Sequence, residues 1–388
     1  MTLEVICFST ADWDAELWTN KQHLMSRLSR MGVKVLYVDS LGLRAPSASA
    51  RDLRRIVRRL TSWRPLATRV QPGLLRDAPL VLPWPSARWV NRQLLTRRVR
   101  RNTRHFHLGK PIVWTYTPAA VDVYDPGQFS GLVYHCVDDL AAYPGIDAAS
   151  FRDREAELVA LADLCIASSR PLVEHLRRLG ARKVIYWPNP ADVEQFLPLS
   201  TCTRPPRDRP QVGFIGAIQE HKVDTQLVID MAHLRPGWDF VLAGPVGLGL
   251  QQSGMHDVLW PVNVRFPGLI ARSDLPGVLE GFDVGLIPYC INDYTRSVFP
   301  MKVFEYLAAG LGVVSTPLPS IVGEVEHIEF ADSATTMVTA LERVMNADLS
   351  SADARRARAE YASAHSWGAR GAQAIAVIEE LAMERPTS

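Results

Sequence analysis

Short apolar runs alternate with stretches of helical periodicity along the whole chain. An apolar run at residues 3–8 is followed by a helical pattern at 15–31 and by a second apolar run at 33–38. This order is typical of a β–α–β unit in a parallel sheet. Further strands are predicted in two series, at 112–116, 131–136, 164–168 and 183–187, and then at 211–215, 239–243, 264–266, 284–287 and 312–315. The pattern therefore predicts an α/β protein with two doubly wound domains.

A proline-rich segment separates the two series of predicted strands. Between residues 188 and 210 stand the prolines Pro188, Pro190, Pro198, Pro205, Pro206 and Pro210. Because proline fixes φ and removes a backbone donor, the segment predicts an interdomain linker at 191–210. The predicted domains are then 1–190 and 211–365. The remaining stretch, 366–388, is amphipathic and is expected to form a helix that packs back on the first domain.

Positive charge is concentrated in one part of the chain. The 388 residues carry 43 basic and 41 acidic side chains, a net charge of +2, which argues against a polycation that coats nucleic acid. Residues 44–104 hold sixteen arginines and two aspartates, with apolar residues at helical spacing and the tryptophans Trp63, Trp84 and Trp89. Basic helices predicted at 51–63 and 89–104 suit the surface of an anionic membrane. A solvated arginine face is the alternative.

Cysteine usage and hydropathy favour a reducing compartment. The five cysteines are scattered and never form a C-x-x-C pair, so neither a disulfide framework nor a cysteine zinc site is predicted. No stretch approaches the roughly 18 apolar residues that a membrane-spanning helix needs. The first apolar run lacks a basic start and ends at Ser9, which predicts a buried strand rather than a signal peptide. A cytoplasmic location is expected.

The segment from residue 300 to residue 319 carries the most informative chemistry. It predicts a helix that starts just after Pro300 and leads through Gly310 into a β-branched strand. The start of a helix offers backbone N–H groups and the positive end of its dipole to phosphate oxygens. Glu305 can accept two hydrogen bonds from a vicinal diol such as a ribose, and Lys302 and Arg296 add positive charge. The segment therefore indicates a nucleotide-sugar site, with an ordinary surface helix as the alternative.

Several segments resemble those of GT-B glycosyltransferases. The likeness is to the family-4-like retaining enzymes of bacterial cell-surface polysaccharide synthesis, and it is carried by residues 300–319, 212–222, 187–196, 282–289 and 133–143. The last of these, VYHCVDDLAAY, resembles the Cys-x-Asp-Asp strand end of a subgroup that includes teichuronic-acid-type transferases. The resemblance implies two Rossmann-like domains facing across a cleft. The N-terminal domain would hold the acceptor, and the C-terminal domain would hold the nucleotide sugar.

The resemblance also assigns donor-binding residues. Glu305 matches the ribose-binding glutamate of the family, and Gly216, which has no Cβ, would let the backbone approach the diphosphate. Lys222 stands where the family usually places a basic residue on the diphosphate. The other donor-binding candidates are Arg296, Ser297, Met301 and Lys302, the last two through their backbone N–H groups. Ser297 replaces an acid that usually contacts the donor hexose, so the sugar stays open.

Catalytic candidates lie at the end of the predicted strand at 131–136. His135 aligns with a family histidine that faces the reacting sugar, and Asp138 and Asp139 follow the strand, where ligands of open α/β sheets gather. These groups can orient the acceptor hydroxyl or stabilise charge on the anomeric carbon. A buried strand-end histidine and two turn aspartates are the alternative. Lys222 is the fourth catalytic candidate, and the acceptor contacts are assigned to Asp12, Trp13 and Asp14.

The sequence thus predicts the transfer of a sugar from a nucleoside-diphosphate sugar to a hydroxyl of a lipid-linked saccharide. The resemblance implies retention, and front-face attack is expected because no side chain stands out as a covalent nucleophile. The Asp12-Trp13-Asp14 triplet is assigned to acceptor contacts rather than to a metal-dependent aspartate-x-aspartate motif, so no tightly bound metal or other cofactor is expected. A nucleotide-sugar 2-epimerase is one alternative. A non-catalytic nucleotide-sugar-binding protein is the other, and it is motivated by Ser297.

Overall fold

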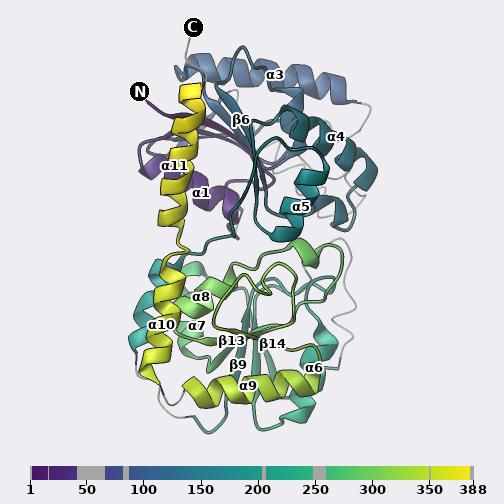
Figure 1. Cartoon of the computed structure of the whole chain (residues 1–388), viewed down its shortest axis with the longest axis vertical. Helices are drawn as coiled ribbons and strands as arrows, with labels where there is room; N and C mark the ends of the chain where they lie inside the picture. Colours follow the sequence, from purple (N-terminus) through teal and green to yellow (C-terminus); the bar gives the residue numbers. More distant parts are fainter. Residues whose placement is uncertain are drawn as a thin grey trace. The chain divides into compact units, whose positions relative to one another are not determined.

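The computed structural model describes residues 2–15, 17–41, 66–81, 87–202, 207–247, 259–348 and 351–384. The chain divides into two units (Figure 1). Unit 1 comprises residues 1–188 and 367–388, and unit 2 comprises residues 189–366. Each unit has its own sheet, as the two series of predicted strands require.

Unit 1 is built on an eight-stranded sheet. Its strands are β1 (Glu4–Phe8), β2 (Lys34–Val38), β3 (Thr68–Gln71), β4 (Leu74–Asp77), β5 (Ile112–Thr115), β6 (Gly131–Cys136), β7 (Leu164–Ala167) and β8 (Val184–Tyr186). The strand order is β3-β4-β2-β1-β5-β6-β7-β8, and only the β3–β4 pair is antiparallel. The helices are α1 (Asn20–Arg30), α3 (Arg88–His105), α4 (Ala148–Leu161), α5 (Arg170–Arg178) and α11 (Trp367–Glu384), with 3-10 turns η2 (Pro118–Asp122) and η3 (Leu140–Ala142).

The central strands of unit 1 are covered on both faces, which is why they appear in the sequence as continuous apolar runs. In β1, residues 5–8 are all fully buried. The C-terminal helix α11 packs beside α1 on this unit (Figure 1). The contact is close: a Cβ added to Gly371 would lie 2.8 Å from Cγ of Arg27. The last helix is therefore an integral part of unit 1.

The first helix begins later than its apolar pattern predicts. A start near residue 15 was expected, but α1 begins at Asn20. Thr19 occupies the N-cap position, and its backbone N–H group donates to Oε1 of Gln22 at 3.0 Å. This reciprocal capping box satisfies backbone donors that would otherwise be unpaired, so it defines the start of the helix. The prediction of a helix at 15–31 is wrong for residues 15 and 17–19.

Unit 2 is built on a six-stranded parallel sheet. Its strands are β9 (Gln211–Ile215), β10 (Asp239–Ala243), β11 (Val264–Gly268), β12 (Val284–Ile287), β13 (Gly312–Ser315) and β14 (Ile328–Phe330). The strand order is β11-β10-β9-β12-β13-β14. The helices are α6 (Thr225–Leu234), α7 (Leu275–Glu280), α8 (Lys302–Ala308), α9 (Ala334–Asp348) and α10 (Ala352–Ser363), with 3-10 turns η4 (Val193–Gln195), η5 (Leu197–Thr201), η7 (Arg272–Asp274) and η8 (Thr295–Ser297).

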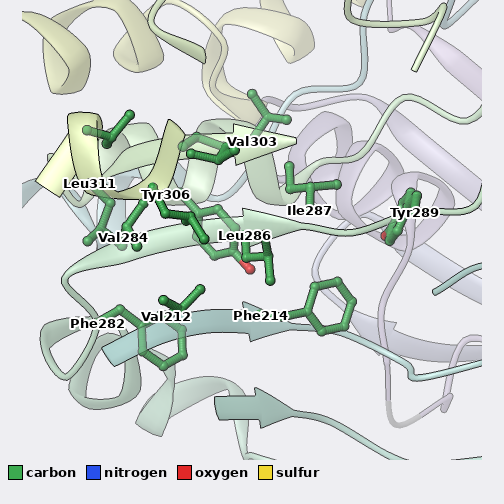
Figure 2. Close-up of a cluster of buried hydrophobic side chains, with 14 of the residues drawn as sticks. Val212, Phe214, Phe282, Val284, Leu286, Ile287, Tyr289, Val303, Tyr306 and Leu311 are labelled. Atoms are coloured by element: carbon green, nitrogen blue, oxygen red, sulfur yellow. The ribbon is translucent and has the colours of Figure 1, made fainter. Parts of the chain in front are cut away.

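Large rings pack directly on the backbone of the central strands of unit 2 (Figure 2). A Cβ at Gly213 in β9 would lie 2.0 Å from the ring of Phe282, and a Cβ at Gly285 in β12 would lie 2.5 Å from the ring of Tyr306. The Tyr306 hydroxyl in turn accepts a hydrogen bond from the backbone N–H group of Ile215 at 2.8 Å. The two contacts of Tyr306 hold α8, which carries it, against β9 and β12.

The proline-rich segment is not a free linker. The prediction of a linker at 191–210 is wrong where the structure describes it, because residues 191–202 and 207–210 belong to unit 2. Ala191, Val193 and Phe196 are fully buried in the core of that unit, and Ala191 forms a β-bridge with Ser366. Pro198 lies within the 3-10 turn η5, beside packed apolar residues, and proline content alone does not separate such packed turns from a linker.

The predicted basic region is described only in part. The helix expected at 51–63 lies outside the described residues, whereas the helix expected at 89–104 is present as α3. Leu95 and Val99 of α3 are buried in unit 1, and Trp89 is 70% exposed. Among the helices that the structure describes, none is both long and apolar enough to cross a membrane.

Candidate functional site

The strand order of unit 2 reverses between β9 and β12. From β9 the chain builds outward through β10 and β11, and it then returns to place β12 on the other side of β9. Ligands of open α/β sheets bind outside the carboxyl ends of the strands at such a switch point. The segments that leave these ends are residues 216–224 after β9 and residues 288–290 after β12, and two backbone contacts join them: Val223 bridges Tyr289, and Cys290 N donates to Lys222 O at 2.9 Å.

Two lysines converge on one buried phenol at this point. The Lys302 Nζ group donates to the Tyr289 hydroxyl at 2.5 Å, and Lys222 Nζ lies 5.0 Å from the centre of the Tyr289 ring. Burial raises the pKa of the Tyr289 hydroxyl. The charges of Lys222 and Lys302 together lower this pKa by more than burial raises it, so the net shift is downward. The cluster therefore concentrates positive charge beside a hydroxyl that can donate a hydrogen bond.

Gly216 lies directly against this cluster. A Cβ at Gly216 would lie 3.3 Å from Nζ of Lys302, and the residue adopts a φ of +143°, where side chains are disfavoured. Gly244, which directly follows β10, approaches still more closely, since a Cβ at Gly244 would lie 2.0 Å from the carbonyl oxygen of Gly216. The structure thus brings together three predicted donor-site residues, Gly216, Lys222 and Lys302, and places half-buried backbone without a side chain beside the positive charges.

Glu305 lies one helical turn beyond Lys302 on α8. Burial raises the pKa of its half-buried carboxyl group, and the charges of Lys302 and Arg272 oppose the rise while that of Asp192 adds to it. Asp192 and Arg272 form an ion pair with each other. The carboxylate is therefore influenced both by a cation of α8 and by the Asp192–Arg272 ion pair.

The other predicted donor residues flank the start of α8. Met301 is its N-cap residue, as the segment after Pro300 predicted. Arg296 is exposed in η8, outside the lysine cluster described above, and Ser297 beside it is 7% exposed. The small side chain of Ser297 is thus packed against the protein at the position where the family carries an acid.

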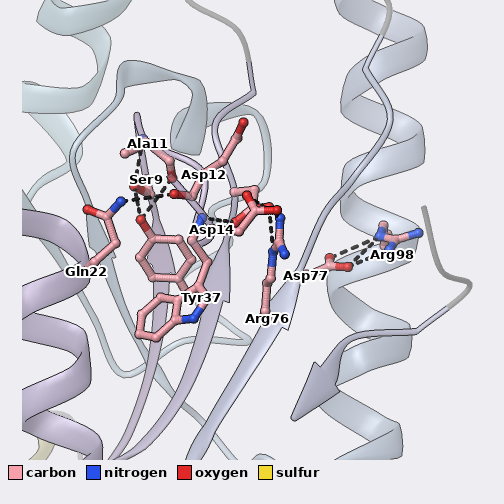
Figure 3. A network of polar contacts seen from close by, with 11 residues as sticks. Ser9, Ala11, Asp12, Asp14, Gln22, Tyr37, Arg76, Asp77 and Arg98 are labelled. Carbon is pink, nitrogen blue, oxygen red and sulfur yellow. Dashed lines mark hydrogen bonds and ion pairs between the residues drawn. The ribbon is translucent and has the colours of Figure 1, made fainter. Parts of the chain in front are cut away.

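The predicted acceptor loop of unit 1 is held by a polar network (Figure 3). The Trp13 backbone N–H group donates to Oδ1 of Asp39 at 2.9 Å, and Arg76 forms ion pairs with Asp39 at 2.7 Å and with Asp14 at 3.1 Å. Burial raises the pKa of Asp39 to about 6, although Arg76 and the Trp13 N–H group counteract this shift. The Asp12 carbonyl accepts a hydrogen bond from Gln22 at 3.0 Å. The loop after β1 is therefore anchored on both sides.

His135 is enclosed by aromatic side chains in β6. Its ring centre lies 4.9 Å from that of Tyr116 and 6.2 Å from that of Trp187, and its Nδ1 atom accepts a hydrogen bond from Trp114 at 3.4 Å. Burial and then the charges of Arg370 and Lys21 lower the pKa of His135 well below its usual range. The imidazole is therefore neutral at physiological pH.

The two aspartates after β6 have different surroundings. Asp139 forms an ion pair with Arg152 at 2.7 Å, and Arg152 also pairs with the buried Glu155 at 3.2 Å. Asp138 is half-buried, and its charge acts on Lys21 of α1. Among the described residues, no group of three or more histidine, cysteine, aspartate or glutamate side chains is arranged to hold a metal ion.

Sequence reasoning missed residues that the fold brings to these places. The segment 282–289 was recognised for its resemblance, but Tyr289 was given no role. Arg272 belongs to none of the recognised segments, although its charge reaches Glu305. Lys21 and Arg370 act on His135 from two helices at opposite ends of the chain. Only the apolar run that leads into Tyr289 offered a signal in the sequence.

Comparison with known proteins identifies the architecture. Residues 224–376 match the family model described as Glycosyl transferase-like. The structure matches sucrose-phosphate synthase from Thermosynechococcus elongatus with a TM-score of 0.74 and 14% identity, over 98% of this chain and 99% of that one. HepE from Anabaena in complex with UDP matches with a TM-score of 0.61 and 16% identity, over 98% of this chain and 100% of that one. The chain has the GT-B fold.

The predicted GT-B architecture of two parallel-sheet α/β domains is thereby confirmed, as is the resemblance to glycosyltransferases. A relative in sequence is TuaH of Bacillus subtilis (strain 168), which is named as a teichuronic acid biosynthesis glycosyltransferase. The two sequences are 38% identical over 109 residues, which is 28% of this chain. The match spans 27% of the length of TuaH.

Proposed function

We propose that this chain is a glycosyltransferase that moves a sugar from a nucleoside-diphosphate sugar to a hydroxyl group of a saccharide acceptor. The observation that carries the proposal is the convergence of Lys222 and Lys302 on Tyr289, beside Gly216 and one helical turn from Glu305. The match of residues 224–376 to a glycosyltransferase-like family model supports it. Because HepE is solved in complex with UDP, we propose UDP as the first nucleotide to test.

In the proposed reaction the two lysines act on the leaving group. When the bond between the anomeric carbon and the diphosphate breaks, negative charge grows on the diphosphate oxygens. Lys222 and Lys302 are held in place by Tyr289, so they interact more strongly with this growing charge without having to reorganise. Glu305 accepts hydrogen bonds from the ribose diol, which aligns the donor over the cluster.

We propose that the configuration at the anomeric carbon is retained, as in the enzymes that the motifs resemble. The acceptor hydroxyl attacks from the face that the diphosphate leaves. Its oxygen forms the new bond to the anomeric carbon, and its proton passes to an oxygen of the departing diphosphate. His135, buried at the end of β6, would position the groups of unit 1 that face the acceptor, and Asp138 and the loop at 12–14 would contact the acceptor.

A nucleotide screen followed by a transfer assay tests this function. UDP, GDP, ADP and dTDP and their sugars are compared for thermal stabilisation, because a ligand that binds the native state raises apparent stability by mass action. We expect stabilisation by one nucleotide, and release of that nucleoside diphosphate only when a saccharide acceptor is added. Formation of an epimer from the donor alone would instead identify an epimerase. Donor binding without turnover or hydrolysis would identify a non-catalytic binding protein.

We further propose that the acceptor is lipid-linked, in cell-surface polysaccharide synthesis, and that α3 rests on the inner face of the anionic cell membrane. The resemblance to TuaH over the matched residues supports the pathway. Trp89 is 70% exposed and Leu94 is 46% exposed on α3, whereas Leu95 is buried. The same helix exposes Arg92, Arg97, Arg100, Arg101 and Arg104. An outward face that combines apolar anchors with arginines suits the headgroup region of anionic phospholipid.

Reversing the charge of Arg97 and Arg101 together is expected to weaken binding to anionic vesicles by more than tenfold. Each basic residue near such a surface contributes about 1 kcal/mol, and a reversal also adds repulsion. Sedimentation with vesicles of increasing anionic lipid content measures the effect. Arg356→Glu, at an exposed position on α10 of unit 2, is the matched control. Binding that is independent of anionic lipid, or unchanged in the double variant, would refute the proposal.

A further inference from the structure

Lys21 occupies an unfavourable position for a cation. It is the second residue of α1, where the positive end of the helix dipole lies, and this helix has no acidic residue in its first turn. The side chain is also buried, with a relative exposure of 6%. Burial lowers the pKa of the Lys21 ammonium, and the negative charge of Asp138 opposes the shift. A buried cation at a helix start is stabilised most simply by an anion.

Arg370 is a second buried cation in the same unit. It is 6% exposed and lies in α11, with its guanidinium carbon 4.7 Å from the centre of the Trp187 ring. Its Nη2 group donates to the carbonyl oxygen of Pro188 at 2.8 Å, whereas Nε and Nη1 are buried without a hydrogen-bond partner among the described residues. Buried polar groups in folded proteins nearly always form hydrogen bonds, so an acceptor for these two donors is expected.

Tyr116 links the two cations. It follows β5, which pairs with β1 at the switch point of the unit 1 sheet, and the start of α1 lies on the segment that leaves β1. Lys21 Nζ lies 5.5 Å from the centre of the Tyr116 ring, and the charge of Arg370 acts on the Tyr116 hydroxyl. That hydroxyl is also buried, and in the part of the chain that the structure describes it meets only the Trp114 side chain, at less than ideal hydrogen-bond geometry, so its own O–H group has no acceptor. Unpaired donors and two cations thus meet at the edge of the sheet where ligands bind.

We propose that Lys21, Arg370 and Tyr116 form an oxyanion subsite in unit 1 that takes a carboxylate or phosphate group of the acceptor. The negative charge of Asp138 acts on Lys21, whereas Arg370 has no ion-pair partner among the described residues, so the cluster retains positive charge for a ligand. Hydrogen bonds from charged donors to an oxyanion are short and strong, and they would satisfy the orphaned groups of Arg370 and Tyr116. The assignment to an acceptor rests on the proposed glycosyltransferase function, whereas binding of an oxyanion does not.

Titration calorimetry of the full chain tests the subsite with three probes: glucuronate, inorganic phosphate and neutral glucose. We expect the wild type to bind glucuronate or phosphate more tightly than glucose, and the better of the two identifies the oxyanion. Lys21→Met should weaken that binding by about tenfold, because one charge-assisted hydrogen bond is lost. Cations of unit 2 also attract phosphate, but they are the same in the wild type and in Lys21→Met, so the difference between these proteins reports on unit 1.

Two further variants keep the test decisive. Lys183→Met removes an exposed lysine of unit 1 that pairs with Glu380, and it should bind the probe as the wild type does. Tyr116→Phe removes only a hydroxyl and covers the case in which Lys21→Met fails to fold. This variant should also bind the oxyanion probe more weakly than the wild type does. Equal affinity of both site variants and the wild type, or glucose binding as tight as that of the oxyanions, would overturn the subsite. Probe binding that depends on Lys21, in a protein that transfers no sugar, would refute the proposed function and leave the subsite standing.

Discussion

Replacing Glu305 with alanine is expected to lower the affinity for the nucleotide donor by about 100-fold or more. A ribose diol can donate two hydrogen bonds to the carboxylate, and a hydrogen bond to a charged group contributes about 1.5–3 kcal/mol. The loss of about 3 kcal/mol corresponds to a factor of about 100 in the dissociation constant. Thermal stabilisation by the nucleotide that the wild type selects, followed by calorimetry, measures the effect.

Two control variants separate this role from a general effect on unit 2. Glu305→Gln keeps the side-chain volume and one acceptor atom, so it should retain part of the affinity. Glu329→Ala removes a carboxylate of β14 that pairs with Arg343, and it should bind the donor normally. Full donor affinity in Glu305→Ala would show that the ribose is held elsewhere.

Protonation of the Glu305 carboxylate should weaken donor binding at low pH. Burial raises the pKa of Glu305, so its proton is taken up at a higher pH than an ordinary glutamate requires. Only the ionised form accepts both hydrogen bonds, so donor affinity should be full above this raised pKa and should fall as the pH drops through it. Glu305→Gln cannot titrate and should lack this contribution.

Replacing Lys302 with methionine is expected to lower kcat by about 100-fold to 1,000-fold, the range seen when one preorganised donor to a developing charge is removed. The ammonium group lies beside Gly216 and donates to Tyr289, so its loss removes charge from the leaving-group site and frees the phenol. The KM for the donor should change less than kcat, because the charge on the diphosphate grows in the transition state. Steady-state kinetics with the selected donor measures both constants.

A second readout follows from the contact with Tyr289. Lys302 is one of the two cations that lower the pKa of this hydroxyl, so the pKa should rise in Lys302→Met. The absorbance of tyrosinate at alkaline pH is titrated in Lys302→Met and in the wild type. The part of the wild-type signal that is missing from Tyr289→Phe identifies the titration of Tyr289. Lys183→Met serves as the control for the loss of a lysine outside the site, and kcat should not change. A kcat of Lys302→Met within a factor of about two of the wild type would remove Lys302 from the reaction.

The sheets were largely predictable because most of their strands are buried on both faces. Such strands, for example β1 and β12, appear as continuous apolar runs. The strands that escaped prediction were the edge strands β3 and β14, and β4, which carries charged residues. Their side chains are partly exposed and include polar residues, so these strands do not appear as apolar runs in the sequence. The late start of α1 did have a signal, the spacing of Thr19 and Gln22.

The candidate site was predictable where its residues share one segment. Lys302 and Glu305 stand one helical turn apart in α8, so their proximity follows from helix geometry alone. Arg272 and Asp192, which pair near Glu305, are 80 residues apart. Arg370 reaches the surroundings of His135 from the last helix of the chain. No local sequence pattern predicts contacts between residues so far apart, because the order of the intervening strands in the sheet determines them.

By itself the sequence determined the alternation of buried strands and helices, and with it two parallel-sheet units, because burial on both faces leaves a continuous apolar trace. It also supplied the residues that bear the chemistry of α8. Only the tertiary structure decided that Ala191, Val193 and Phe196 of the proline-rich segment are packed core, that Tyr289 joins two lysines, and that Lys21 and Arg370 are buried around Tyr116. These outcomes depend on which distant segments share a sheet edge, and that is set by the packing of the whole unit.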